Sequence, residues 1–196
     1  MGKVLFNISM SLDGYVAGPN DEVDKLFGWY FSGDTAFPFP GSDLVFMVSR
    51  ASADLLAEAS RTVGAMVTGR RNFTGAGGWG GKPPLGVPHF VVTHNVPQEW
   101  VKEGSPFTFV TDGVESAIAQ AKKTAGDRDV AVSSPNVMRQ CLTAGLIDEF
   151  HIDLAPVLMG KGVRLFEPLG AEPVALECVR VVAGHGVTHL KYLVVK

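Results

Sequence analysis

Short β-branched segments alternate with helical segments along most of this chain, and its final part carries strands only. The predicted strands of the first part are 3–9, 65–68, 90–93, 107–110 and 130–133. Strands that alternate with helices favour parallel pairing within one sheet. In the last part the predicted strands are 150–154, 174–182 and 187–195, and Gly184-His185-Gly186 suits a hairpin between the last two. The pattern predicts an α/β fold whose mixed, mostly parallel sheet has about eight strands and ends in an antiparallel hairpin.

Helical spacing of apolar side chains, at intervals of three and four residues, marks the segments between these strands. One predicted helix spans 43–60 and begins at Asp43. Another follows Asp112, with Glu115 three residues later as in a capping box. The segment 18–42 has neither the helical nor the strand period. A loop of this length in a compact domain is usually functional.

The composition excludes several classes of protein. The chain has 196 residues and a formal net charge of −3 at pH 7, with no basic stripe of the kind that a nucleic acid or an anionic membrane selects. No apolar run approaches the ~18 residues of a membrane span, and the N-terminus does not read as a signal peptide. Cys141 and Cys178 lack metal or disulfide spacing, so both are expected to be buried and reduced. We expect one domain, 1–196, in the cytoplasm, with no nucleic-acid partner, membrane or metal.

Polar side chains gather where the predicted parallel strands end. After Thr68 come Gly69, Arg70, Arg71 and Asn72, at the start of a short helix. Free N–H groups at a helix start and guanidinium groups make a plausible phosphate site, although a solvated pair of surface arginines explains these residues equally well.

Two further strand ends carry similar groups. Thr93-His94 follows one strand, and Ser133-Ser134-Pro135-Asn136 follows another, where Ser134 caps a predicted helix with Pro135 at its first position. In open α/β sheets, ligands bind at the carboxyl ends of the strands. The three clusters together therefore predict a binding edge.

Two carboxylates are candidates for catalysis. Asp13 follows the first strand and turns toward the same edge. Asp43 opens a predicted helix beside Phe37 and Phe39, where it is either a helix cap or a partly desolvated acid–base group. Three more ionisable residues share one face of a later strand: Glu149, His151 and Asp153. A half-exposed strand explains that face better than a metal site does.

The whole pattern resembles the dihydrofolate-reductase-like superfamily, and most closely the reductase domain of the riboflavin-biosynthesis deaminase/reductase. The matching segments are 11–17 (Ser-Leu-Asp-Gly-Tyr-Val-Ala), 68–71 (Thr-Gly-Arg-Arg), 145–151, 156–162 and 165–166. The deaminase half has no counterpart, so the chain is similar to a stand-alone reductase domain. The resemblance implies a three-layer fold with helices on both faces of the sheet, and a homodimer.

The resemblance also implies NADPH as the hydride donor and a pyrimidine- or pterin-like small molecule as the substrate. It places the phosphates near Arg70, Arg71, Thr93 and His94, and the nicotinamide near Val16-Ala17. The residues expected to bind the cofactor are Val16, Ala17, Gly69, Arg70, Arg71, Asn72, Thr93, His94, Ser133, Ser134, Asn136 and Val137. Asp43 is similar in placement to the carboxylate that assists protonation in dihydrofolate reductases, and Asp13 resembles a substrate contact.

One departure from the family pattern leaves alternatives open. The family usually has two glycines where this chain has Ser133-Ser134, and Pro135 follows. Serine side chains would crowd a pyrophosphate, and proline removes an N–H donor. Three functions therefore remain: an NADPH-dependent reductase of the riboflavin-pathway type, a dihydrofolate reductase, or a ligand-binding protein on the same fold that has lost tight NADPH binding.

Overall fold

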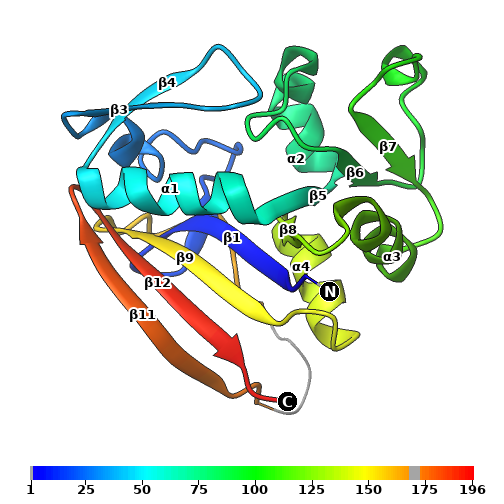
Figure 1. Ribbon diagram of the computed structural model, residues 1–196. Helices are drawn as coiled ribbons and strands as arrows, with labels where there is room; N and C mark the ends of the chain where they lie inside the picture. The colour runs from blue at the N-terminus through cyan, green and yellow to red at the C-terminus, as the bar shows by residue number, and fades with distance from the viewer. Residues whose placement is uncertain (1, 168–172) are drawn as a thin grey trace.

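A mixed eight-stranded sheet forms the centre of the protein, with the strand order β11-β12-β9-β1-β8-β5-β6-β7 (Figure 1). The computed structural model describes residues 2–167 and 173–196. The strands of this sheet are β1 (Val4–Ser11), β5 (Val63–Gly69), β6 (His89–Val92), β7 (Phe107–Val110), β8 (Asp129–Val132), β9 (Glu149–Ala155), β11 (Leu176–Gly184) and β12 (Val187–Val194). The strands from β9 to β7 pair in parallel, whereas β12 pairs antiparallel with both β9 and β11. The predicted mixed sheet with a C-terminal hairpin is confirmed.

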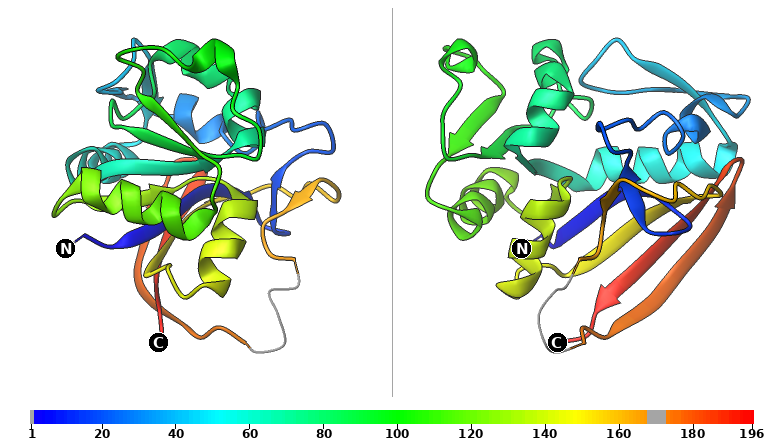
Figure 2. Two further views of the ribbon diagram at one scale, coloured as in Figure 1. Left: turned by 90° about the vertical axis from the view of Figure 1, so that its right-hand side faces the viewer. Right: turned by 180° about the vertical axis from the view of Figure 1, so that it is seen from behind.

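Helices cover both faces of the sheet (Figure 2). They are α1 (Arg50–Thr62), α2 (Arg70–Gly75), α3 (Val114–Ala125) and α4 (Pro135–Thr143). Alternate residues of β1 point to opposite faces, as in any strand. Val4 and Phe6 belong to the main core, which includes apolar side chains of α3 and α4, whereas Leu5 and Asn7 face α1. The first three residues of β1, Val4–Phe6, are therefore buried on both sides of the sheet, whereas Asn7 is exposed.

The predicted helix 43–60 is wrong in its first half. Residues 45–48 form β4 (Val45–Val48), which pairs antiparallel with β3 (Thr35–Pro38), and α1 begins only at Arg50. Ser49 caps this helix by accepting a hydrogen bond from the Ser52 N–H. The apolar spacing from 44 to 48 fits a helix and a strand equally, and the β-branched and aromatic residues of β4 favour the strand.

Two smaller expectations also differ from the structure. Helix α3 begins after Gly113 with no side-chain cap, so Asp112 does not form the predicted capping box. Cys178 is exposed because it lies on the edge strand β11, whereas Cys141 is buried as expected. The predicted start of α4, with Ser134 as cap and Pro135 in the first turn, is confirmed.

Short elements order much of the remaining chain. Strand β2 (Tyr15–Ala17) pairs with β10 (Val163–Arg164) in a separate two-stranded sheet. The 3-10 helices are η1 (Gly28–Phe31), η2 (Gly77–Gly81) and η3 (Gln98–Trp100). Aromatic contacts from Tyr30 to Phe39 and Phe46 pack the β3–β4 hairpin onto η1. Within the described residues, no helix is long and apolar enough to cross a membrane.

Candidate functional site

The carboxyl ends of β1, β8, β5 and β6 lie side by side at one edge of the sheet, because these parallel strands are neighbours. We call this the carboxyl edge. The Asn72 side chain joins two of the strand ends, since its Nδ2 donates to Thr68 Oγ1 at 2.9 Å and to the Ser133 carbonyl at 3.3 Å. The structure thus brings the residues that follow β5 and β8 to one place.

Gly69, the last residue of β5, packs against the start of α4. A Cβ atom at Gly69 would approach Ser134 Oγ to 2.8 Å and Val137 Cγ2 to 3.3 Å. The first distance is too short for van der Waals contact, so a larger residue would force the two elements apart. Glycine at this position therefore allows the start of α4 to lie directly on the carboxyl edge.

The start of α4 presents hydrogen-bond donors at this edge. Ser134 makes no side-chain capping bond, and Pro135 has no N–H. The first N–H groups of a helix have no acceptor within it, which applies here to Asn136 and Val137. The Ser133 hydroxyl is buried and has no hydrogen-bond partner among the residues that the structure describes. A buried, unsatisfied polar group costs about 1–3 kcal/mol, so this hydroxyl fits a site in which a ligand completes its hydrogen bond.

Arg70 and Arg71 begin α2 as the sequence predicts, but they contact different partners. Arg70 Nε donates to Thr74 Oγ1 at 2.9 Å, and its Nη1 donates to the Asn95 carbonyl at 3.2 Å. Arg71 forms a two-point ion pair with Asp21, at 2.8 Å for Nη2–Oδ1 and 2.9 Å for Nε–Oδ2. Arg71 is exposed, so its pair with Asp21 is a solvent-facing one.

Four other predicted cofactor residues differ in exposure. Val16 and Ala17 are buried in β2, and Val16 joins the main core. Thr93 is buried at the end of β6, and its hydroxyl donates to the Asn95 carbonyl at 2.9 Å. His94 is exposed. Of these four, only His94 presents its side chain to solvent beside the carboxyl edge.

Asp13 ties the end of β1 to the segment that follows β9. Its Oδ1 accepts hydrogen bonds from Ser11 Oγ at 2.6 Å and Met159 N at 3.1 Å, and its Oδ2 accepts from Gly160 N at 2.7 Å. The hydrogen bond from Ser11, followed by those from the backbone, lowers the pKa of Asp13 to about 2. Both oxygens are engaged within the protein, which indicates that Asp13 holds this segment in place.

Asp43 does not open a helix, and the premise of its predicted catalytic placement is wrong. It lies in the turn between β3 and β4, with its side chain 91% exposed. Its Oδ2 accepts a hydrogen bond from Lys82 Nζ at 2.6 Å, which lowers the pKa of Asp43. The structure therefore places Asp43 on the surface, in an ion pair with Lys82.

A second polar region lies beneath α1, on the opposite face of the sheet from α3 and α4. His189 of β12 is opposite Asp153 of β9, and its Nδ1 lies 2.6 Å from Asp153 Oδ1. The other ring nitrogen, Nε2, lies 2.8 Å from Ser52 Oγ of α1. The Trp29 ring meets the His189 ring edge-on, with centroids 5.2 Å apart. Ser52 and His189 are both buried.

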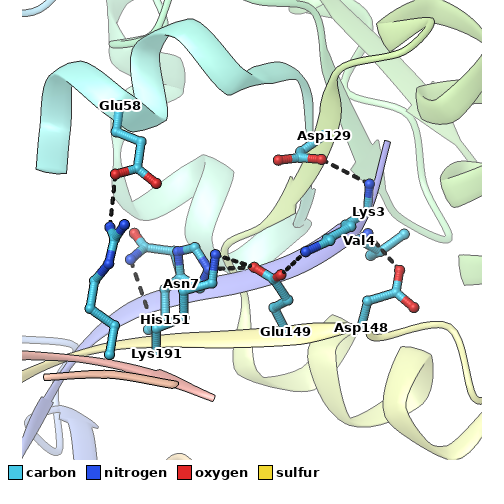
Figure 3. A network of polar contacts seen from close by, with 10 residues as sticks. Lys3, Val4, Asn7, Glu58, Asp129, Asp148, Glu149, His151 and Lys191 are labelled. Carbon is cyan, nitrogen blue, oxygen red and sulfur yellow. Dashed lines mark hydrogen bonds and ion pairs between the residues drawn. The ribbon is translucent and has the colours of Figure 1, made fainter. Parts of the chain in front are cut away.

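The same face carries a buried carboxylate that is bonded to two lysines and a histidine (Figure 3). Glu149 is bonded to Lys3, to Lys191 Nζ at 2.8 Å and to His151 Nε2 at 2.9 Å. Burial raises the pKa of Glu149, but hydrogen bonds from Lys191, Lys3 and His151 outweigh burial and lower it to about 2. Glu149 is therefore ionised and fully engaged.

A cavity of about 130 Å³ separates α1 from the sheet. Leu5, Leu56 and Met66 line its apolar part, and Asp153 and His189 line its polar part, together with other charged groups. An apolar cavity of ~150 Å³ in a protein core is large enough for benzene. The cavity is therefore large enough for about one ring. It lies beneath α1 and reaches the carboxyl edge at Asp153, which is paired with Ser9, near the carboxyl end of β1.

The sequence matches the RibD C-terminal domain family over residues 2–190. The chain belongs to this family. It is 23% identical over 181 residues to the uncharacterized protein YwjB of Bacillus subtilis, a match that covers 87% of this chain and 86% of YwjB.

Solved structures show the fold that this RibD C-terminal domain shares. A putative riboflavin biosynthesis protein from Shewanella sp. PV-4 has a TM-score of 0.74 and 22% identity, with full coverage of both chains at 100%. The deaminase/5-amino-6-(5-phosphoribosylamino)uracil reductase of Thermotoga maritima has a TM-score of 0.65 and 12% identity, over 99% of this chain and 57% of that one. Dihydrofolate reductase from Enterococcus faecalis, complexed with NADP(H), has a TM-score of 0.58 and 16% identity, over 100% and 98%. The predicted dihydrofolate-reductase-like fold and the resemblance to riboflavin-pathway reductase domains are confirmed.

Sequence reasoning missed the Ser52–His189–Asp153 cluster of this RibD C-terminal domain. The sequence pattern indicates a half-exposed face for Asp153, although its side chain is only 13% exposed. The signal that unites them is the register of β12 on β9, which places His189 opposite Asp153. Register depends on the whole sheet, so one sequence does not reveal it.

Proposed function

We propose that this RibD C-terminal domain is a reductase that uses NADPH to reduce a pyrimidine-like small molecule. The observation that carries the proposal is the Ser133 hydroxyl, which is buried without a partner among the described residues, next to the uncapped start of α4. Family membership supports a reductase-like domain. The substitution of serines for glycines is compatible with this function, because a hydroxyl can donate the hydrogen bond that a backbone N–H would otherwise make.

The cofactor phosphates would be held by groups at the carboxyl edge. The N–H groups of Asn136 and Val137, with the Ser133 hydroxyl, fit a pyrophosphate, because helix starts favour anions. Arg70 and Arg71 would hold the 2′-phosphate, and Gly69 keeps α4 close to β5. When bound, NADPH supplies the hydride.

The Arg71–Asp21 pair bears on the choice of cofactor. Its two side chains are 72% and 48% exposed, and ion pairs this exposed to water contribute only about 0–1 kcal/mol. A dianionic phosphate would therefore compete with Asp21 for Arg71 at little cost. This arrangement supports selection of NADPH over NADH by Arg71.

The substrate class rests on two observations. The riboflavin-pathway relatives include a protein named for its action on 5-amino-6-(5-phosphoribosylamino)uracil, and the cavity beneath α1 has room for about one ring. We take this uracil derivative as the probe substrate. The polar part of the cavity carries charges of both signs, because Glu58 and Asp153 lie there together with Arg180 and Lys191. A small molecule that neither sign of charge repels would suit such a cavity.

A second function, a ligand-binding protein without tight cofactor binding, is favoured by Pro135, which removes one N–H from the helix start. Titration with NADPH, followed by thermal unfolding, separates the two. At 100 times its dissociation constant, NADPH should stabilise the fold by about 2.7 kcal/mol. No stabilisation at millimolar NADPH contradicts the reductase.

The variant Arg71→Ala should weaken NADPH binding about tenfold to a hundredfold and leave NADH binding nearly unchanged, because a charge-assisted hydrogen bond contributes about 1.5–3 kcal/mol. Isothermal titration with both cofactors measures this. The matched control is Arg61→Ala, which removes an exposed arginine from the last turn of α1 and should bind both cofactors as before. Equal losses for the two cofactors in Arg71→Ala would show that Arg71 does not read the 2′-phosphate.

The homodimer and the cytoplasmic location belong to the same proposal. Strand β11 is the edge of the sheet, and its exposed apolar residues include Leu176, Val179 and Val181. An exposed apolar edge strand favours pairing with a second copy. Sedimentation equilibrium tests the dimer. Cys141 and Cys178 are both free, which accords with a reducing compartment.

A further inference from the structure

Reduction of a double bond requires a proton as well as a hydride, and most carboxylates near the carboxyl edge are poorly placed to deliver one. Asp13 accepts three hydrogen bonds, and its pKa is lowered to about 2. Asp43 lies on the surface with Lys82. Glu149 is held as an anion by its cationic partners. Asp153 differs from all three, because it lines the cavity and its carboxylate contacts His189 and Asn7 rather than a lysine or backbone N–H groups.

The groups around Asp153 form a continuous hydrogen-bonded chain to the start of α1. Asp153 Oδ1 lies 2.6 Å from His189 Nδ1, and His189 Nε2 lies 2.8 Å from Ser52 Oγ. Ser52 Oγ lies 2.9 Å from Ser49 Oγ, and Ser49 is only half-buried. If Nδ1 carries the imidazole proton and donates to the carboxylate, Nε2 is an acceptor, so Ser52 donates to His189 and Ser49 donates to Ser52. Every contact in the chain is then satisfied in one direction.

The end of this chain lies at the carboxyl edge. Phe6 of β1 is paired with Val132 of β8, directly before Ser133, and Ser9 is paired with Asp153. Asp153 therefore lies about three residues further along β1 than Val132, and two strands away from it, or roughly 10 Å in each direction. Because α4 and the Asp153 carboxyl lie on opposite faces of the sheet, a substrate that reaches both would lie across the carboxyl edge.

A nucleophilic role for Ser52, as in hydrolases with a similar Ser–His–Asp chain, does not fit the packing. A Cβ atom at Gly184 would lie 2.7 Å from Ser52 Oγ and 3.3 Å from His189 Nε2, so the backbone of β11 covers both atoms. Ser52 is 1% exposed, which leaves no approach for a carbonyl carbon. The hydrogen-bonded chain can transfer protons, but an acyl group does not fit beside Ser52.

We propose that Asp153 and His189 supply the proton of the reduction, and that the hydroxyls of Ser52 and Ser49 restore it from solvent. In the loaded state, the pair holds one proton more than a carboxylate with a neutral imidazole. Asp153 passes this proton to the substrate atom that becomes negative when its double bond is reduced. The hydride brings both electrons, with NADPH as the group oxidised, and the pair is left as carboxylate and neutral His189.

The pair is then recharged through the serines. Ser49 takes a proton from solvent and gives its own to Ser52, Ser52 gives its own to Nε2, and one solvent proton is consumed for each substrate reduced. The proposal rests on the reductase function proposed above. Asp153 is its proton donor, and His189, Ser52 and Ser49 act through it.

The first test needs no substrate. In protein labelled with ¹⁵N-histidine, nitrogen shifts across a pH series should show two forms of His189: the discharged form, with its proton on Nδ1 and Nε2 accepting a hydrogen bond, and the loaded form, with a proton on Nε2 as well. Ser52→Ala should shift the Nε2 signal, whereas the matched control Ser60→Ala should not, because the Ser60 hydroxyl bonds only to the Leu56 carbonyl of its own helix. An Nε2 signal that keeps one protonation state at every pH at which the protein is folded overturns the relay, since Ser52 could not then pass a proton to His189.

The second test follows NADPH oxidation in a single turnover with the uracil probe. Removal of a general acid typically lowers a rate about 10²- to 10⁴-fold, so the single-turnover rate of Asp153→Asn should be at least about a hundredfold lower than that of the wild type. Ser52→Ala should lose roughly tenfold and show a larger solvent deuterium isotope effect, with NADPH affinity unchanged; Ser60→Ala should match the wild type. An unchanged rate and isotope effect in Ser52→Ala, in protein that melts as the wild type does, overturns the relay. A wild-type protein that binds no NADPH contradicts the reductase itself, and the NADPH titration detects that separately.

Discussion

The two polar regions of this domain differ in how far their hydrogen bonds are satisfied within the protein. At the carboxyl edge, the Ser133 hydroxyl is buried with no partner among the described residues, and Arg71 faces solvent. Beneath α1, Glu149 is bonded to two lysines and to His151, and both nitrogens of His189 are engaged. The two regions are only a few residues apart along β1.

This difference separates two uses of buried polar groups. An unsatisfied donor costs stability in the free protein and is compensated when a ligand accepts its hydrogen bond. A saturated network adds rigidity, and the removal of one member leaves the others unpaired. Substitutions in the two regions should therefore change stability in opposite directions.

The largest expected effect is at Glu149. Glu149→Gln should lower the free energy of unfolding by about 3 kcal/mol, because it leaves the partly buried Lys191 without its anion, and broken buried pairs typically cost 3–5 kcal/mol. Urea unfolding at pH 7 measures this. The matched control is Glu58→Gln, whose partly exposed pair with Arg180 at 2.7 Å should contribute less than about 1 kcal/mol. Equal losses in both variants would show that the buried network is not special.

His89 lies between these extremes, because one ring nitrogen is engaged and the other is not. Its Nδ1 lies 2.8 Å from the Val87 carbonyl, whereas its Nε2 is buried with no partner in the described part of the chain. Burial lowers the pKa of His89 to about 4, so His89 is neutral in the folded protein above that pH. The unfolded chain binds the proton first as the pH falls, and up to about 3 kcal/mol of stability should be lost between pH 6.5 and 4.

The variant His89→Asn should lack this part of the pH dependence, because asparagine does not titrate. Unfolding in urea at several pH values measures the slope. The Glu149 carboxylate acts in a different window: its lowered pKa stabilises the fold above pH 4.5, and that stabilisation is lost between pH 4.5 and 2. If the stability of the wild type and of His89→Asn falls equally steeply between pH 6.5 and 4, groups other than His89 cause that pH dependence.

The smallest effect should be found at the carboxyl edge and have the opposite sign. Ser133→Ala should raise the stability of the ligand-free protein by about 1 kcal/mol, because it removes a buried hydroxyl that lacks a partner. The same change should weaken NADPH binding by about tenfold. Thermal melts with and without NADPH measure both. Ser116→Ala is the control, since this hydroxyl accepts a hydrogen bond from Gln120 on α3. A destabilised Ser133→Ala protein would show that the hydroxyl already has a partner.

Local sequence signals predicted the carboxyl edge but not the region beneath α1. Strands β5, β6 and β8 are short β-branched runs, and Ser134-Pro135 is a strong signal for the start of a helix. The polar groups at the ends of these strands could therefore be predicted from neighbouring residues in the sequence. Asp43 was misplaced because the apolar pattern near it fits both periods, and β4 is decided by pairing with β3. Asp153 and His189 meet across 36 residues of chain, through a strand register that no local pattern specifies.

The position of β1 has a consequence for how the chain is made. Strand β1 leaves the ribosome before the other strands of this sheet and lies between β8 and β9, where Phe6 is paired with Val132 and with Phe150. At about 5–20 residues per second, the nascent chain waits on the order of ten seconds before both neighbours exist. Until then, β1, with its apolar side chains Val4 and Phe6, lacks at least one of its two neighbouring strands, β8 and β9. Until β9 has emerged, this apolar strand lacks its full pairing, and exposed segments of this kind make a nascent chain prone to aggregation.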